Sequence, residues 1–380
     1  MKYKAIICFS AIDWNYLKQR TQYLMAGMAE RGLQVLFIEN TGVRCPGFSD
    51  LPRVVNRIRN AAGQTGEDVP EGINIFSPLA IPMPYNNFAI SYNKFYISLR
   101  IRKFLADNSI TPAEVIFWTS LATPAVLDIM RSHSWGATVY DVVSDPKFIE
   151  PSLEPFEKEM TAFSDITLFA SSTLREQYLL QTKNPVLFRD GFNTDLLKNQ
   201  NHVFEMEKLP RPRFIYIGGI NNKVMAKALE TLAGHYRGGS VVLVGPVIGG
   251  YKIPSRENIY IFPPRRKYRE LSGFLLAADA GLIPYFSDKY SGAMQPAKLN
   301  EYLVSGLPVV GTDTPELKKL TGLWGEGFFY LYDTPEKIAV AAEKALLEDS
   351  AQLRSKRQEF ALDNTWNVRV FELLDMLDQF

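Results

Sequence analysis

The hydrophobic residues of this chain fall into short continuous runs, and amphipathic stretches with a helical spacing lie between them. Runs of this kind are typical of strands that are covered on both faces of a sheet. In the first half of the chain they cover residues 5–9, 35–39, 115–118, 137–140, 166–170 and 186–188. In the second half they cover residues 213–217, 240–244, 258–262, 280–283 and a run that begins at Val309. Strands that alternate with helices predict an α/β fold with two parallel sheets.

A polar stretch with two prolines, residues 197–213, separates the two sets of strands. A chain of 380 residues is also longer than one hydrophobic core usually serves. We therefore expect a first domain at residues 1–195 and a second domain at residues 196–362. The last residues, 363–380, have an amphipathic pattern and need an apolar surface to cover.

Residues 284–313 combine the strongest structural and chemical signals in the chain. A polar loop at residues 286–295 precedes a helix that we expect to begin at Pro296, because proline suits a first helical position, and to end at Gly306. The spacing of three places Lys298 and Glu301 on one face of this helix. Apolar residues occupy the other face: Leu299, Tyr302 and Leu303.

A helix that begins at the end of a buried strand presents free N–H groups and a positive dipole end, which attract anions. Lys298 adds a positive charge in the first turn, and the Glu301 carboxylate can accept hydrogen bonds from hydroxyl groups. Phosphates next to a diol are what a nucleotide sugar presents. The alternative is an ordinary surface helix with one ion pair.

Two aspartates, Asp141 and Asp145, follow the strand predicted at residues 137–140. Open α/β sheets bind ligands at this end of their strands, and a carboxylate there could act as general base toward an acceptor hydroxyl. The alternative is that each aspartate only caps a loop or helix. Glutamates of the next helix, expected at residues 155–163, are predicted to face outward: Glu154, Glu157 and Glu159.

Basic residues are concentrated in two amphipathic segments, although the formal net charge of +1 gives no overall attraction to nucleic acid. One segment begins at Arg53 and ends at Arg59; the other, KFYISLRIRKFL, begins at Lys94 and ends at Leu105. Basic and aromatic residues on one helix suit the surface of an anionic membrane. The alternative is a helix whose apolar side covers the sheet while its cations are solvated.

The cysteines and histidines favour neither disulfides nor a metal site. The two cysteines, Cys8 and Cys45, form no disulfide framework, which fits a reducing compartment. The three histidines are scattered without metal-ligand spacing: His133, His202 and His235. No run approaches the roughly 20 apolar residues needed to span a bilayer. We expect a cytoplasmic protein that is peripheral on the inner face of the cell membrane.

Several motifs together resemble the "group 1" class of GT-B glycosyltransferases. AKLNEYLVSGLPVV, residues 297–310, resembles the family pattern K-x-x-E-[YA]-x-x-x-G-x-P-V-V and is the most specific match. DGFN at residues 190–193 stands where the family carries N-G-V-D between its domains, and Trp366 resembles the tryptophan of its C-terminal helix. Asp13-Trp14 with Gln19-Arg20 resembles the opening of the subset that acts in teichuronic-acid and capsular polysaccharide pathways. The likeness covers nearly the whole chain.

The resemblance implies a GT-B fold, with two Rossmann-like domains facing across a cleft and a C-terminal helix that crosses back to the first domain. It also implies a metal-independent hexosyltransferase without a cofactor. The donor would be a nucleotide-diphosphate sugar of the UDP or GDP type. The acceptor would be a hydroxyl of a glycan, expected to be lipid-linked, in the biosynthesis of the bacterial cell envelope.

The resemblance also assigns roles to single positions. Glu301 would hold the ribose hydroxyls and Lys298 the diphosphate. Asp145, or failing that Asp141, would face the acceptor as the catalytic base. Backbone and glycine positions would line the donor site: Gly218, Gly219, Met294, Gln295 and Pro296.

Two departures from the family pattern leave other functions open. Ala293 stands where many members have the first of two glutamates, and Ile220 stands where many have an arginine. Asn221, Asn222 or Lys223 could compensate for that arginine. The departures favour the branch with inverting members, in which an aspartate base is expected. The alternatives are a sugar-nucleotide-binding module without catalysis and a GT-B sugar-nucleotide epimerase.

Overall fold

A computed structural model describes residues 2–15, 18–41, 69–81, 83–145, 148, 150–198, 203–265 and 268–379. The contacts divide the chain into two compact units. Unit 1 comprises Met1–Ala170, Leu174–Arg189 and Arg369–Phe380, and unit 2 comprises Ser171–Thr173 and Asp190–Val368. The basic segment from Arg53 to Arg59, with Cys45 and His202, lies outside the described residues.

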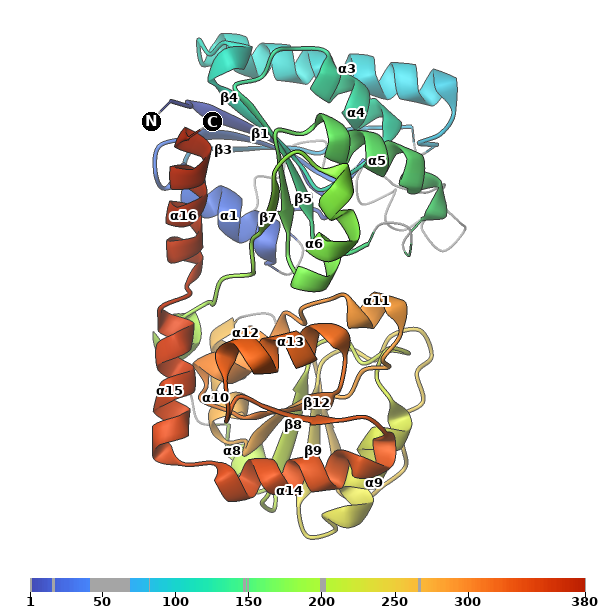
Figure 1. The fold of residues 1–380 in the computed structure, drawn as a ribbon, viewed down its shortest axis with the longest axis vertical. Helices are drawn as coiled ribbons and strands as arrows, with labels where there is room; N and C mark the ends of the chain where they lie inside the picture. Colours follow the sequence, from blue (N-terminus) through green and yellow to red (C-terminus); the bar gives the residue numbers. More distant parts are fainter. Residues whose placement is uncertain are drawn as a thin grey trace. The chain divides into compact units, whose positions relative to one another are not determined.

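Unit 1 contains a seven-stranded parallel sheet (Figure 1). Its strands in spatial order are β3 (Ile73–Phe76), β2 (Gln34–Ile38), β1 (Ala5–Phe9), β4 (Val115–Thr119), β5 (Ala137–Val142), β6 (Ile166–Phe169) and β7 (Pro185–Leu187). Six of these strands lie at predicted positions to within one or two residues. Only β3 was not predicted, because it is an incompletely buried edge strand without a continuous apolar run.

Helices flank this sheet. Those of unit 1 include α1 (Arg20–Ala29), α3 (Asn87–Asp107), α4 (Pro124–Arg131), α5 (Glu154–Phe163) and α6 (Ser172–Tyr178). The last helix, α16 (Trp366–Asp378), lies alongside α1 with Val370 against Gly27, where a Cβ would come 2.8 Å from the valine (Figure 1). The Tyr3 hydroxyl donates to the Leu377 carbonyl at 3.2 Å, which ties the end of α16 to the start of the chain.

Unit 2 contains a six-stranded parallel sheet. Its strands in spatial order are β10 (Ile259–Phe262), β9 (Ser240–Val244), β8 (Arg213–Ile217), β11 (Ala280–Ile283), β12 (Val309–Thr312) and β13 (Phe329–Tyr332). Only β13 was not predicted. The helices are α7 (Asp195–Lys198), α8 (Phe204–Glu207), α9 (Ala226–His235), α10 (Tyr268–Leu276), α11 (Lys289–Gly292), α12 (Lys298–Val304), α13 (Pro315–Trp324), α14 (Ile338–Glu348) and α15 (Ala351–Leu362).

Strand order places a switch point in each sheet. In unit 2 the chain adds β9 and β10 on one side of β8, and then β11, β12 and β13 on the other side. In unit 1 the same reversal lies between β1 and β4. Open α/β sheets bind ligands outside the carboxyl ends of the strands at such points. Both units therefore have the architecture of a Rossmann-like domain, as the sequence predicted.

Candidate donor and acceptor sites

The candidate donor site lies at the carboxyl ends of β8 and β11. Gly218 follows β8 with a φ of +105°, a conformation that favours glycine. The loops after the two strands are joined, because the Met225 N–H donates to the Pro284 carbonyl at 2.7 Å and the Phe286 N–H to the Lys223 carbonyl at 3.1 Å. These bonds give the edge of the sheet a defined backbone.

The helix that carries Lys298 begins later than the sequence predicted. α12 starts at Lys298 and not at Pro296, and its seven residues make its dipole short. The predicted polar loop also contains a short helix, α11, which Asp288 caps by accepting from the Ser291 N–H at 2.7 Å. Positive charge at this edge therefore comes mainly from Lys298 rather than from the helix dipole.

Lys298 is held by two tyrosines. Its Nζ donates to the hydroxyl of Tyr216 at 3.2 Å and to that of Tyr285. The same atom lies 4.3 Å from the centre of the Tyr216 ring and 4.7 Å from that of Tyr285. Burial lowers the pKa of Lys298. The effects of Tyr285 and Tyr216 raise this pKa by more than burial lowers it, so the net shift is upward. The lysine is therefore charged at neutral pH.

Gly218 lies beside the lysine side chain. A Cβ on Gly218 would lie 3.6 Å from Nζ and from Cε of Lys298. Gly219 accepts the Tyr216 hydroxyl at 2.8 Å through its carbonyl, and a Cβ there would lie 3.0 Å from Ile248. Gly218 thus brings backbone close to the ammonium group.

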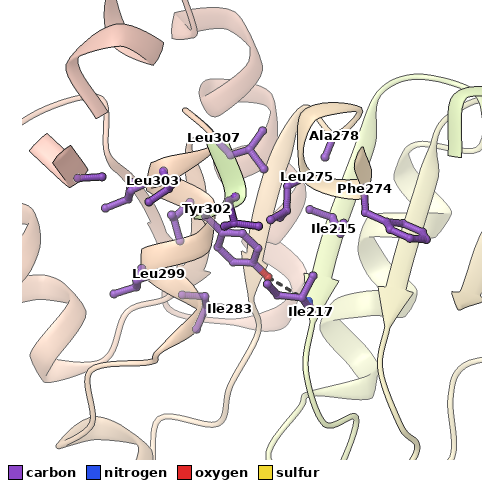
Figure 2. Packing of buried hydrophobic residues seen from close by; sticks show 14 of the residues in the cluster. Ile215, Ile217, Phe274, Leu275, Ala278, Ile283, Leu299, Tyr302, Leu303 and Leu307 are labelled. Carbon is purple, nitrogen blue, oxygen red and sulfur yellow. Dashed lines mark hydrogen bonds between the residues drawn. The ribbon is translucent and has the colours of Figure 1, made fainter. Parts of the chain in front are cut away.

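The apolar face of α12 fixes the position of Lys298, as the sequence predicted. Leu299, Tyr302 and Leu303 are fully buried in the core between α12 and the sheet. The Tyr302 hydroxyl donates to the Leu282 carbonyl at 3.1 Å and accepts from the Ile217 N–H at 3.2 Å, the dashed contact in Figure 2. The helix is thereby bonded to both β11 and β8.

The remaining predicted donor residues lie on or just before α12. Glu301 is half-buried and follows Lys298 by three residues, so both lie on one face of the helix. Met294 and Gln295 are half-buried, and Pro296 is buried. A second cation lies near this edge, because the Lys223 Nζ is 4.1 Å from the centre of the Tyr290 ring.

Tyr216 and Tyr285 were not predicted as site residues. Tyr216 lies in the buried strand β8, and Tyr285 follows β11 by two residues, so both look like core residues in the sequence. The only available signal was the position of each tyrosine at the carboxyl end of a strand that borders the switch point.

Unit 1 holds the two predicted base candidates in different surroundings. Asp141 lies within β5 and binds Arg20 in a buried ion pair, with Nη2 2.9 Å from Oδ1. Asp145 lies three residues beyond that strand, is also buried, and accepts the Tyr178 hydroxyl at 3.2 Å. The aspartates are therefore more than simple caps of a loop or helix.

A buried glutamate accompanies Asp145. Glu157 of α5 lies 3.0 Å from the Tyr178 hydroxyl and 3.4 Å from that of Tyr140. The prediction that Glu157 faces outward was wrong, because these buried tyrosines give its carboxylate polar partners inside the fold. Burial, then Glu157 and then Asp145 raise the pKa of Tyr178, so this hydroxyl remains protonated.

The described part of the chain contains no group of three or more His, Cys, Asp or Glu side chains arranged to hold a metal ion. Among its helices, none has both the length and the apolar character needed to cross a bilayer.

Comparison with known proteins gives one match in sequence. No model of a protein family matches the chain. The chain is 28% identical over 160 residues to TuaH of Bacillus subtilis (strain 168), which is named provisionally as a teichuronic acid biosynthesis glycosyltransferase. The match covers 40% of this chain and only 39% of TuaH.

Comparison with solved structures covers almost the full length. Sucrose-phosphate synthase from Thermosynechococcus elongatus matches with a TM-score of 0.69 at 13% identity, over 99% of this chain and 98% of its own. HepE of Anabaena, solved with UDP and glucose, matches with a TM-score of 0.64 at 12% identity over 100% of both chains. WaaG, a glycosyltransferase of lipopolysaccharide biosynthesis, matches with a TM-score of 0.60 at 13% identity over 98% of this chain and 99% of its own. The chain therefore has the fold of the GT-B glycosyltransferases, and part of its sequence is similar to TuaH.

Proposed function

We propose that the chain is a glycosyltransferase whose nucleotide-diphosphate sugar binds at the switch point of the second sheet. The observation that carries the proposal is the charged Lys298 beside Gly218, to which the described residues give hydroxyl partners and no carboxylate. A diphosphate gains negative charge as it leaves the sugar, and a fixed positive charge at that place is usually the largest contribution to such catalysis.

The proposed reaction exchanges one bond at the anomeric carbon. The acceptor hydroxyl oxygen forms a bond to this carbon while the bond between the same carbon and the diphosphate oxygen breaks. The bonding electron pair leaves with the nucleoside diphosphate, whose charge Lys298 offsets. Glu301, one helical turn further, would accept hydrogen bonds from the ribose hydroxyls, and the backbone from Met294 to Pro296 would lie along the phosphates.

The acceptor proton needs a base in unit 1, and we propose Asp145 for this role, with inversion at the anomeric carbon. Asp141 remains the second candidate, but the buried pair with Arg20 suits a structural carboxylate better than one that takes up a proton. Tyr178 would orient the Asp145 carboxylate through its hydroxyl.

The proposed substrates follow from the relatives. TuaH is named for teichuronic acid biosynthesis, and HepE was solved with UDP. We propose a UDP- or GDP-sugar as donor and a lipid-linked glycan hydroxyl as acceptor, in the synthesis of a bacterial cell-surface polysaccharide. We expect transfer to persist in the presence of a metal chelator, because Lys298 supplies positive charge at the diphosphate.

The distribution of exposed apolar and basic residues on α3 supports a membrane-bound acceptor. Ile97, Ile101 and Phe104 bury one face of this helix, whereas Phe88, Phe95 and Leu99 are 73%, 60% and 45% exposed on another. Arg102 and Lys103 are exposed near the end of this second face. We propose that this face lies on an anionic membrane, which would make the protein peripheral on the cytoplasmic side.

The experiment that tests the donor site is a thermal-shift screen with UDP-, GDP- and dTDP-sugars. We expect one class of donor to stabilise the wild type and the Lys298→Ala variant to lose most of this stabilisation. Lys344→Ala is the control, because Lys344 is an exposed lysine of the same unit, on α14, paired with Glu348. Equal stabilisation of all three proteins would refute the proposed site.

A binding module without catalysis is the second candidate, and Ala293 in place of the family glutamate favours it. An assay of free nucleoside diphosphate, with donor and a lipid-linked acceptor fraction, separates the two functions. Donor binding without release of nucleoside diphosphate would support the module. Conversion of the nucleotide sugar to an epimer would instead support the epimerase.

A further inference from the structure

The Lys298 ammonium group is in direct contact with hydroxyl groups and aromatic rings rather than with a carboxylate. It contacts two hydroxyl groups and two aromatic rings, whose centres lie 6.4 Å apart with planes at 75°. A buried cation normally pairs with an anion, because the loss of hydration costs several kilocalories per mole. Here hydroxyl dipoles and ring faces replace part of that hydration and leave the positive charge without a counter-ion among the described residues.

The hydrogen bonds around Tyr216 have a definite direction. Its hydroxyl donates to the Gly219 carbonyl at 2.8 Å, so the oxygen lone pairs are left for Lys298, which can only donate. The chain of donors therefore runs from Lys298 through Tyr216 to the loop after β8. This arrangement orients the ammonium group toward that loop.

Tyr285 is attached to the same loop through its backbone. It pairs with Val224 in an antiparallel bridge, and its neighbours on both sides make the hydrogen bonds that join the loops after β8 and β11. The Tyr285 hydroxyl is thus held at a fixed place relative to Gly218.

We propose that Tyr216 and Tyr285 are positioning residues, which hold the Lys298 ammonium at the strand edge so that a diphosphate becomes its counter-ion on binding. This inference rests on the proposed function of the site. A carboxylate in place of either hydroxyl would neutralise the lysine and compete with the diphosphate. Apolar residues in their place would leave the ammonium group of the half-buried Lys298 with a larger desolvation cost.

The pKa of the Tyr285 hydroxyl reports the charge of the neighbouring Lys298. Burial raises the pKa of Tyr285, but Lys298, with smaller contributions from Tyr216 and Lys223, lowers it by more than burial raises it, so the net shift is downward. Other titratable groups at this place are Tyr216 and, on α12, Glu301 and Tyr302. A diphosphate that takes up the charge of Lys298 should return the pKa of Tyr285 toward its ordinary value.

The first experiment measures the affinity for UDP and for GDP by calorimetry. Tyr285→Phe and Tyr216→Phe should each weaken binding of the preferred nucleotide about tenfold, as expected for the loss of one hydrogen bond to a charged group. Tyr236→Phe is the matched control, because this tyrosine packs on Phe214 at the opposite end of β8. Wild-type affinity in both tyrosine variants would overturn the inference and leave the proposed function intact.

The second experiment follows tyrosinate absorbance during an alkaline titration of the free protein. In the wild type, one tyrosine should ionise below the ordinary range for tyrosine; Tyr285→Phe should abolish this titration, and Lys298→Ala should shift it upward. Saturating nucleotide should also shift it upward. A titration that Lys298→Ala leaves unchanged would overturn the inference, even if neither UDP nor GDP binds. Failure of both nucleotides to bind the wild type would refute the proposed function instead.

Discussion

Arg20 binds Asp141 with its Nε 3.0 Å from both carboxylate oxygens, and the two side chains are only 3% and 0% exposed. The pair joins the first turn of α1 to β5. Since each charge is buried, the attraction between them mainly offsets the cost of removing both from water. Removal of either residue would therefore leave the other as a buried charge without its partner.

We predict that Arg20→Met destabilises the protein by about 3–5 kcal/mol, because it leaves a buried carboxylate without its cation. Urea denaturation measures the effect. The double variant Arg20→Met/Asp141→Leu should recover most of the loss. Lys103→Met is the control, because the exposed Lys103–Asp107 pair should contribute less than about 1 kcal/mol. A loss of similar size in Arg20→Met and Lys103→Met would contradict the prediction.

Asp145→Asn should lower turnover by roughly 10²- to 10⁴-fold, the usual contribution of a general base. Nucleotide affinity should stay unchanged, because Lys298 lies in the other unit. The measurement compares release of nucleoside diphosphate with binding of the same nucleotide. Turnover at the wild-type rate would remove Asp145 from the mechanism and leave Asp141 as the candidate.

Replacement of Phe88 and Phe95 by serine should weaken binding to vesicles that contain anionic lipid. Each phenylalanine can contribute about 1.5–3 kcal/mol when its ring leaves water, so the double variant should lose at least roughly a hundredfold in affinity. Val340→Ser is the control, because Val340 is 66% exposed on α14 of the other unit. Vesicle binding that survives the double serine variant would contradict the proposed membrane face.

Gly245→Ala should destabilise unit 2, whereas Gly322→Ala should stabilise it. Gly245 has a φ of +152°, and a Cβ there would lie 2.1 Å from the Gly218 carbonyl oxygen, so the backbone next to Lys298 would have to move. Gly322 lies within α13 with nothing near its Cβ position, so alanine there should add about 0.5–1 kcal/mol. Thermal denaturation measures both changes, and a stabilised Gly245→Ala variant would contradict the prediction.

The sequence predicted the fold well because buried parallel strands leave a clear pattern. The strands β1, β8, β9 and β11 have the predicted bounds, and each consists of residues that are completely or almost completely buried. The edge strands β3 and β10 are less buried; β3 was missed, whereas an apolar run still indicated β10. Helix boundaries were less accurate, as the start of α12 shows, because apolar spacing predicts the buried face of a helix and not its first residue.

The sequence predicted only some of the residues of the candidate site. Spacing alone placed Lys298 on the polar face of its helix. The two tyrosines around it come from β8 and from the end of β11, and only the strand order brings them together. The partner of Asp141 also comes from a distant part of the chain, because Arg20 precedes it by 121 residues. Contacts of this kind depend on topology, which a periodic pattern does not specify.

The Glu114 carboxylate should make stability depend on pH in the acid range. Its Oε1 lies 2.5 Å from the Lys4 Nζ, and its Oε2 accepts the Thr111 N–H at 2.9 Å and hydroxyl at 2.8 Å. The bond to Lys4, followed by those to Thr111, lowers the pKa of Glu114 from 4.5 to about 2. A carboxylate with a lowered pKa in the folded state stabilises the fold above its unfolded pKa and loses this effect as it is protonated.

The stabilisation by Glu114 should therefore be complete above pH 4.5 and disappear as the pH falls toward about 2. Glu114→Gln keeps the shape of the side chain but cannot titrate, so its stability should change less than that of the wild type over this interval. Lys4→Met should reduce the pH dependence without abolishing it, because the bonds to Thr111 remain. Chemical denaturation at a series of pH values gives the slopes, and equal slopes in the wild type and Glu114→Gln would show that folding does not lower the pKa of Glu114.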